Sequence, residues 1–232
     1  AHVESYLKYG FIPEPYTLIK NIRKVSAGSI EIFSLINLSH QTKTYWCLDN
    51  SENSSTQTPH ITLRMILEEV AEFITLSDEP VGIALSGGID SSLLAVLTKD
   101  SGREIQSFSV GYHGDHESDE SPLAASFAKS LGMKHHIVKL ETKDVARRFG
   151  ELCLVRDEPI ADIAGAGYLA LAELMKLNGI KVMLNGQGAD EIFWGYKWVA
   201  NNVKTGNRRA KFLSGKKNYS EYLRFQPIPD GL

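Results

Sequence analysis

Short apolar runs alternate with helical patterns along the middle of the chain. Four runs are apolar or alternate with polar residues, as buried strands do: 81–85, 105–112, 135–140 and 181–185. Four stretches between and after them have the composition or spacing of helices: 91–100, 121–131, 143–156 and 163–177. Strands and helices that alternate across short connections are typical of a parallel sheet covered by helices. The pattern therefore predicts the α/β class, a doubly wound parallel sheet with helices on both faces.

The first 60 residues follow a different pattern. Residues 1–49 mix short β-prone runs with turn residues, which predicts a small, partly β connector segment. The β-prone runs are 29–35 and 44–46. The ten residues from Asn50 contain no large apolar side chain, and such a stretch cannot offset its ordering entropy. We therefore expect an exposed linker at 50–60, with the sheet domain at 61–196.

A helix is expected at the start of the sheet domain, over 61–76. Four apolar residues recur there at helical spacing: Ile66, Val70, Phe73 and Ile74. We expect this stripe to pack into the core.

The end of the chain, 197–232, is locally basic. Between Lys197 and Lys217 there are seven lysine and arginine residues and no acidic residue. We interpret this segment as the helical start of a C-terminal extension with a solvated basic face, and a phosphate-facing patch is the alternative.

Composition and charge exclude several classes of protein. The chain has 232 residues, of which 43% are hydrophobic and 23% charged, so it is neither disordered nor collagen-like. A net charge of −3 provides no basic field for nucleic acid. Cys47 and Cys153 are the two cysteines, too few for a metal cluster. There is no apolar signal core and no run near the ~18 residues of a membrane span, so we expect a cytoplasmic protein without a membrane partner.

The strongest chemical signal is the string Ser86-Gly87-Gly88-Ile89-Asp90-Ser91-Ser92, between a predicted strand and a predicted helix. A helix start presents unpaired N–H groups and positive potential, and glycines let the backbone approach an anion closely. Asp90 would repel a bound phosphate unless a cation lay between them, so the string predicts a polyphosphate with Mg²⁺. The alternative is an ordinary Gly-Gly turn with a capped helix.

This string resembles the PP-loop of the ATP pyrophosphatases, which split ATP into AMP and pyrophosphate while adenylating a substrate. Three further segments resemble glutamine-dependent asparagine synthetases, in the same order along the chain. Asn185-Gly186-Gln187-Gly188-Ala189-Asp190-Glu191 is similar to their Ser-Gly-Glu-Gly-Ser-Asp-Glu motif. Residues 157–162, DEPIAD, are similar to their Asp-Glu-Pro-x-x-Asp segment, and residues 5–46 to their connector before the synthetase domain. The chain is therefore identified as a member of that family, with an adenine nucleotide alpha hydrolase-like fold.

The resemblance implies a role for individual residues. The implied pyrophosphate contacts are Ser86, Gly87, Gly88, Asp90, Ser91 and Ser92. The implied Mg²⁺ ligands are Asp90 and Asp190. The implied contacts to the rest of the nucleotide are Leu85, Val110, Asn185 and Gly186. The residues that could meet the substrate are Asp157, Glu158, Asp162 and Gln187, of which Gln187 and Glu158 are catalytic candidates. For the three acidic residues, helix capping and a turn are the alternative.

The chain also departs from the family pattern. Gln187 replaces the first glutamate of the second motif, and an amide cannot accept a proton as a general base. No lysine after Tyr196 matches the family's late catalytic lysine, and no N-terminal catalytic cysteine is present. We therefore expect a glutaminase domain or partner to supply ammonia, and we leave a homodimer open.

The expected activity is that of an asparagine synthetase-like ligase that uses ATP and Mg²⁺. It would adenylate a small-molecule carboxylate, aspartate by default, release pyrophosphate, and pass the acyl group to ammonia or another amine. Three alternatives stay open: a lactam- or peptide-forming synthetase, a tRNA-modifying PP-loop enzyme, and an ATP-binding module without full activity. The near-neutral charge argues against a tRNA partner.

Overall fold

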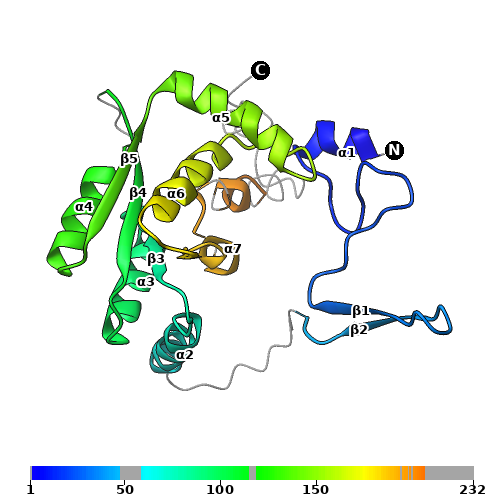
Figure 1. Cartoon of the computed structure of the whole chain (residues 1–232), viewed down its shortest axis with the longest axis horizontal. Helices are drawn as coiled ribbons and strands as arrows, with labels where there is room; N and C mark the ends of the chain where they lie inside the picture. The colour runs from blue at the N-terminus through cyan, green and yellow to red at the C-terminus, as the bar shows by residue number, and fades with distance from the viewer. Residues whose placement is uncertain are drawn as a thin grey trace, which may run out of the picture. The chain divides into compact units, whose positions relative to one another are not determined.

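Four short strands form one parallel sheet, as the alternating pattern predicts (Figure 1). The computed structural model describes residues 2–47, 59–114, 119–193, 195–197, 199 and 201–206. The strands are β3 (Val81–Ala84), β4 (Gln106–Tyr112), β5 (His135–Leu140) and β6 (Val182–Leu184). Their order across the sheet is β5-β4-β3-β6. The chain divides into two compact units, residues 1–184 and 185–232, and the sheet belongs to the first.

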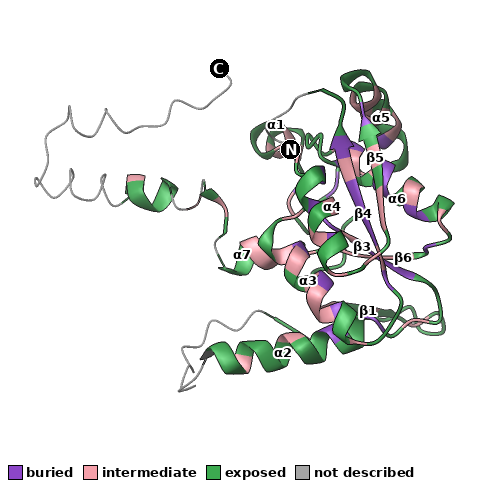
Figure 2. Ribbon diagram, turned by 90° about the vertical axis from the view of Figure 1, so that its left-hand side faces the viewer, coloured by how far each residue is buried: buried purple, intermediate pink, exposed green. Residues whose placement is uncertain are grey.

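Helices cover both faces of the sheet, so the fold is doubly wound. α3 (Ile89–Asp100) and α4 (Ser121–Ser130) pack on one face and α6 (Gly165–Leu177) on the other, and α5 (Thr142–Val155) packs against α6. Ile83 and Leu85 pack on one face with residues of α3 and α4, whereas Phe108 packs on the other face with residues of α6. Successive strand residues point to opposite faces, which is why short apolar runs can serve two cores. Figure 2 shows β4 buried between these layers.

The strand order creates a switch point between β3 and β6. From β3 the chain steps to β4 and then to β5, and it returns to the opposite side of β3 as β6. In open α/β sheets, ligands bind outside the carboxyl ends of the strands at such a point. The loop that contains Ser86 to Gly88 leaves the carboxyl end of β3.

The helix expected at 61–76 is present as α2 (Pro59–Ile74), but its stripe does not pack into the core. Ile66, Val70 and Phe73 are 50%, 44% and 64% exposed. The buried positions are Ala71 and Thr75. Thr75 follows the last residue of α2, and its hydroxyl donates to the carbonyl of Ala71 at 2.9 Å, so the end of the helix is buried at these two small residues.

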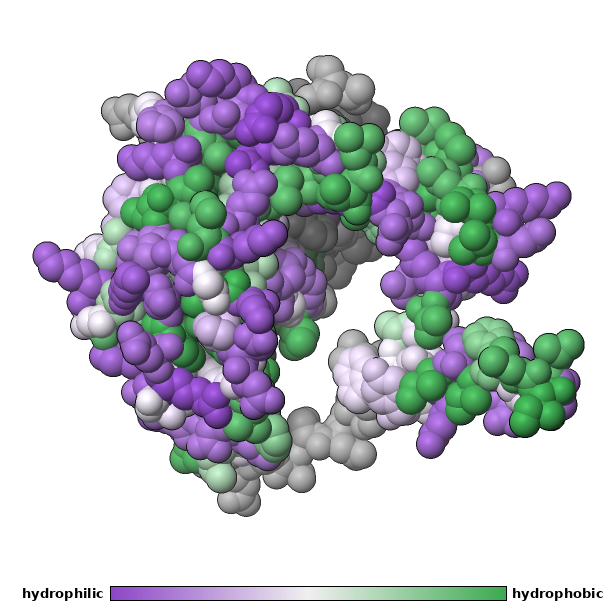
Figure 3. All heavy atoms as spheres, in the orientation of Figure 1, coloured by the Kyte–Doolittle hydropathy of each residue, from purple (hydrophilic) through white to green (hydrophobic). Residues whose placement is uncertain are grey.

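The N-terminal segment is partly β, and it also contains a helix that the sequence analysis did not predict. The helix is α1 (His2–Tyr9). β1 (Ser29–Phe33) pairs antiparallel with β2 (His40–Thr44), so the second strand begins before the predicted run 44–46. The hairpin carries exposed apolar side chains around its turn, among them Leu35 and Ile36 (Figure 3).

The second unit begins with the Gly-rich motif at Asn185 and contains α7 (Ala189–Phe193). Residues 201–206 are helical, in line with the expected helical start of the final segment, and Lys204 is exposed there. The other basic residues from Arg208 onward lie outside the described residues, as does most of the expected linker. Among the helices that the structure describes, none is long and apolar enough to cross a membrane. The domain boundaries expected from the sequence stay a prediction.

Candidate functional site

The loop after β3 begins at a firmly held residue. Leu85 is buried, its N–H donates to the carbonyl of Phe108 at 2.8 Å, and its carbonyl accepts a hydrogen bond from the hydroxyl of Ser109. Two residues later, Gly87 has φ +85°, a conformation that favours glycine. A Cβ there would lie 3.1 Å from Leu123 Cγ and 3.2 Å from Ala124 N, so the start of α4 packs closely against the loop.

Two serine hydroxyls close the loop on itself. The Oγ atoms of Ser86 and Ser91 are 2.9 Å apart, and the N–H of Gly88 donates to Ser86 Oγ at 3.2 Å. Ser91 is buried and also donates to the carbonyl of Gly88 at 3.2 Å. Gly88 is the N-cap of α3 and makes no side-chain cap hydrogen bond. No side chain caps the first N–H groups of α3, so these groups can donate hydrogen bonds to an anion.

Asp90 lies in the first turn of α3 and is partly exposed. Among the described residues it makes no hydrogen bond or ion pair, so its oxygens can bind a cation. The described residues contain no cluster of three or more metal-binding side chains. One partly exposed carboxylate beside a helix start that can bind phosphate fits Mg²⁺, which is commonly held by one or two carboxylates together with water and substrate phosphates.

Val110 lies on β4, the neighbour of β3, and packs in the α6-side core. The residue after it, Gly111, lies against Ser121 and Asp119. Asp119 was not singled out from the sequence, although an acidic residue just before a Ser-Pro helix start is a capping signal. It accepts hydrogen bonds from the N–H groups of Ser121 at 2.9 Å and Tyr112 at 3.3 Å. Partial burial opposes ionisation of Asp119, but hydrogen bonds from Ser121 and Tyr112 outweigh it and lower its pKa.

The three acidic candidates between α5 and α6 have different environments. Asp157 is exposed, and Asp162 accepts a hydrogen bond from the N–H of Ala164 at 2.9 Å, which caps the turn before α6. Glu158 is mostly buried and forms an ion pair with Lys24. Lys24 was not singled out from the sequence, because its partner lies more than one hundred residues away.

The second motif, in the other unit, is also a hydrogen-bonded turn. The N–H of Gln187 donates to Asn185 Oδ1 at 3.1 Å, and Gly188 has φ +103°. Asp190 is in the first turn of α7, where its carboxylate fills the space that a Cβ on Gly195 would need. Gly186 lies in this turn between Asn185 and Gln187.

Glu191, next to Asp190, has a partner of its own. Its carboxylate accepts a hydrogen bond from the hydroxyl of Tyr196 at 2.6 Å, and this bond lowers the pKa of Glu191. The neighbouring Asp190 makes no such bond among the described residues. Within this unit, Asp190 is therefore the carboxylate better suited to meet a cation.

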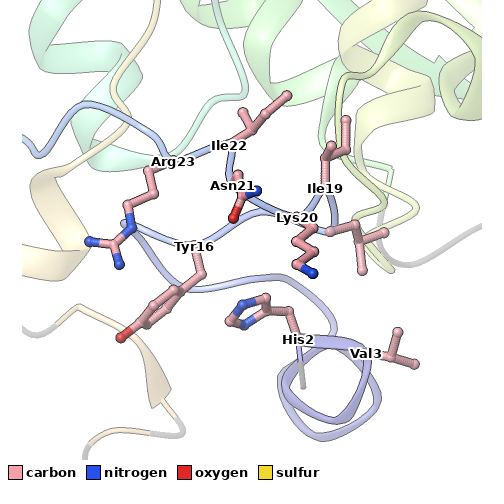
Figure 4. A pocket seen from close by; sticks show the side chains of 9 residues that line it. His2, Val3, Tyr16, Ile19, Lys20, Asn21, Ile22 and Arg23 are labelled. Atoms are coloured by element: carbon pink, nitrogen blue, oxygen red, sulfur yellow. The ribbon is translucent and has the colours of Figure 1, made fainter.

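A pocket of about 420 Å³ lies elsewhere, on the N-terminal segment. Its lining includes Lys20 and Arg23, and the rings of His2 and Tyr16 stack beside it at 4.8 Å (Figure 4). None of the predicted site residues lines it. The pocket is therefore not the predicted nucleotide site.

Comparison with protein families gives one long match. Residues 62–226 match the family described as asparagine synthase, which is more than half of the chain. The match includes the Gly-rich loop after β3, the acidic segment 157–162 and the second motif.

Individual relatives agree with the family match. The chain is 31% identical over 229 residues to the amidase chyE of Penicillium rubens, covering 84% of this chain and 34% of that protein. It is 30% identical over 198 residues to asparagine synthetase [glutamine-hydrolyzing] 1 of Bacillus subtilis, covering 84% of this chain and 30% of that protein. The chain thus spans about a third of the length of both. Among solved structures, NMN synthetase from Francisella tularensis is 15% identical with a TM-score of 0.42, over 59% of this chain and 58% of that one.

Proposed function

The chain belongs to the asparagine synthase family, and from that premise we propose that it is the ATP-binding synthetase part of an amide-forming ligase. One observation carries the proposal: the Ser86–Ser92 loop leaves β3 beside the switch point and opens α3 with uncapped N–H groups. An anion at this position meets the backbone donors and the positive end of the helix dipole. Triphosphate is the anion that the family's chemistry requires.

Each group of the loop has a part in holding ATP. The first N–H groups of α3 bind the phosphate oxygens that become pyrophosphate. Gly87 lets the chain turn at φ +85° where the loop packs against α4 and a side chain would not fit. Asp90 would hold Mg²⁺ at this loop, where the ion would neutralise the charge that develops on the leaving pyrophosphate. In the second unit, Asp190 is the carboxylate that the family resemblance assigns to the cation. Val110, which is partly exposed, offers apolar surface to the adenosine, whereas the side chain of Leu85 is buried in the core and does not.

The proposed reaction has two steps. A carboxylate oxygen of the substrate attacks the α-phosphorus of ATP, the bond to pyrophosphate breaks, and an acyl-adenylate forms. An amine nitrogen then attacks the acyl carbon, the bond to AMP breaks, and the amine loses a proton, which gives the amide. Aspartate and ammonia are the default substrates, with the ammonia supplied by a glutaminase domain or partner. Much of the catalysis depends on hydrogen-bond donors that are already in position where negative charge develops in the transition state.

Gln187 favours a second candidate, a lactam- or peptide-forming synthetase of the same fold. The family motif has a glutamate where this chain has an amide that cannot take a proton. A site altered at this position is compatible with an amine other than ammonia. A screen of carboxylates for pyrophosphate release, with and without ammonium, separates the two candidates.

The substitution Asp90→Asn tests the proposal in the full-length protein. It keeps the size of the side chain and removes the charge that would hold the cation, so we expect pyrophosphate release from ATP to fall at least about 100-fold. Asp100→Asn is the matched control, because Asp100 ends the same helix and is exposed. The role of Asp90 is refuted if Asp90→Asn releases pyrophosphate at the rate of Asp100→Asn.

A further inference from the structure

The N-terminal connector contacts the acidic loop that precedes α6. The N–H of Ala161 donates to the carbonyl of Gly10 at 2.8 Å. Gly10 has φ +77°, and a Cβ there would lie 3.3 Å from the Cβ of Ala161, so the two backbones pack closely. Lys24 and Glu158 add an ion pair to this contact. Two points of attachment hold the connector on the loop.

Lys24 projects from an ordered turn. Its own N–H donates to the carbonyl of Pro15 at 3.0 Å. The hydroxyl of Thr17 donates to the carbonyl of Ile22 at 2.9 Å, which closes the turn from the inside. Lys24 Nζ also lies 3.5 Å from the carbonyl of Ile12, which is buried. The ammonium group is therefore held by its backbone and by two acceptors.

Glu158 has one paired and one unpaired oxygen. The side chains of Lys24 and Glu158 are 33% and 15% exposed, and Oε2 is the oxygen that meets Lys24. Oε1 is buried and has no hydrogen-bond donor among the described residues. A buried carboxylate oxygen without a donor is costly, and such atoms in proteins have a partner as a rule. The described residues thus leave Oε1 without a donor, and a bound ligand can supply one.

The loop that contains Glu158 lies at the carboxyl ends of the strands. After α6 the chain passes Lys181, whose N–H donates at 3.1 Å to the carbonyl of Pro80, just before β3. The C-terminal end of α6 is thus at the amino ends of the strands, and its N-terminal end is at the opposite side. A Cβ on Gly167, in the first turn of α6, would lie 3.9 Å from Val110 and from the hydroxyl of Tyr112, at the carboxyl end of β4. Ligands of such sheets bind on this side.

We propose that Lys24 is a positioning residue that holds the Glu158 carboxylate in place, so that Oε1 accepts a hydrogen bond from an N–H of the attacking amine. The inference rests on the proposed ligase function. The amine nitrogen forms its bond to the acyl carbon as the bond to AMP breaks, and its proton passes to solvent. Glu158 orients the nitrogen during this step. The connector is thus a working part of the amine site.

The test compares lysine variants in the full-length protein with ATP, aspartate and ammonium chloride. Lys24→Met keeps the apolar stem and removes the charge, so we expect KM for ammonium to rise about tenfold while Kd for ATP, measured by calorimetry, stays unchanged. Lys24→Arg restores a cation and recovers part of this loss. Lys20→Met is the matched control, because Lys20 is exposed on the same turn. Glu158→Gln should lower kcat/KM for ammonium about 10- to 100-fold.

Two results overturn the inference. One is an ammonium KM in Lys24→Met equal to that of Lys20→Met. The other is a parallel loss of ATP affinity in Lys24→Met, which marks a purely structural role. If the parent protein releases no pyrophosphate with any carboxylate, the proposed function fails by itself. Crystals grown with methylammonium then decide the inference. A methylammonium nitrogen about 3 Å from Oε1 in the parent but not in Lys24→Met supports the inference. A parent structure without this nitrogen overturns the inference.

Discussion

Replacing Gly87 by alanine should damage both the stability of the protein and its affinity for ATP. Gly87 has φ +85°, and a Cβ there would lie 3.1 Å from Leu123 Cγ and 3.2 Å from the backbone nitrogen of Ala124. The second neighbour is backbone, which cannot move aside as a flexible side chain can. The loop must therefore shift away from α4 to accept the methyl group.

The magnitude follows from two separate costs. An alanine in a left-handed conformation costs about 1–2 kcal/mol, and overpacking adds about 1–3 kcal/mol. We expect the free energy of unfolding to fall by about 2–5 kcal/mol. A shifted loop also loses at least one hydrogen bond to a charged phosphate, worth about 1.5–3 kcal/mol, so Kd for ATP should rise at least about tenfold.

Gly102→Ala is the matched control for this experiment. Gly102 has φ +74° and no atom within 4 Å of the position of a Cβ, so it carries the backbone cost alone. Urea unfolding and calorimetry with ATP should show a loss of about 1–2 kcal/mol and parent-like ATP affinity for Gly102→Ala. If the two variants lose the same free energy and bind ATP alike, the reasoning about the loop and α4 is refuted.

Two further predictions concern the second motif and the sheet. Gly195→Ala places a methyl group where the Asp190 carboxylate lies, so we expect Mg²⁺-dependent pyrophosphate release to fall about tenfold or more. Gly206→Ala is the control and should keep the parent rate, because no atom lies within 4 Å of the position of its Cβ. Equal rates in the two variants would exclude the proposed role of Asp190. Burial, together with nearby positive charge, lowers the pKa of both His135 and His136 in the folded chain. Unfolded histidines bind protons at higher pH than these folded ones, so their neutral state stabilises the fold fully above about pH 6.5, and this stability is lost as the pH falls from there. Urea unfolding at several pH values should show that the free energy of unfolding falls below about pH 6.5. A double variant with glutamine at both positions should show a weaker dependence of this free energy on pH. An unchanged dependence would contradict the role assigned to the two histidines.

Local patterns were sufficient for the sheet. All four strands and the helices that flank them were predicted within a few residues of their observed bounds, because buried strands need apolar runs and amphipathic helices need a stripe. The Gly-rich loop after β3 was predicted for a similar reason, since a left-handed turn before a helix start requires glycine. Local patterns did not show α1, and they placed the second hairpin strand too late.

Long-range contacts account for what the sequence analysis missed at the site. Glu158 was a candidate, but its partner Lys24 lies in the connector, and no local spacing relates the two residues. Asp162 was grouped with Glu158, yet it accepts a hydrogen bond in the turn before α6, which is the alternative that the sequence analysis left open. The stripe of α2 shows the same limit, because helical spacing predicts which residues share a face but not which face meets the rest of the fold.

The sequence by itself determined the α/β class, the family and the residues of the two Gly-rich motifs. Each of these depends on which residue types stand next to one another or one helical turn apart, and that information is contained in short segments. The strand order, the switch point beside β3 and the pairing of Lys24 with Glu158 were decided only by the tertiary structure. These features depend on how segments far apart in the sequence pack together. The packing is determined by the burial of all the apolar faces of helices and strands against one another, and no single segment contains that information.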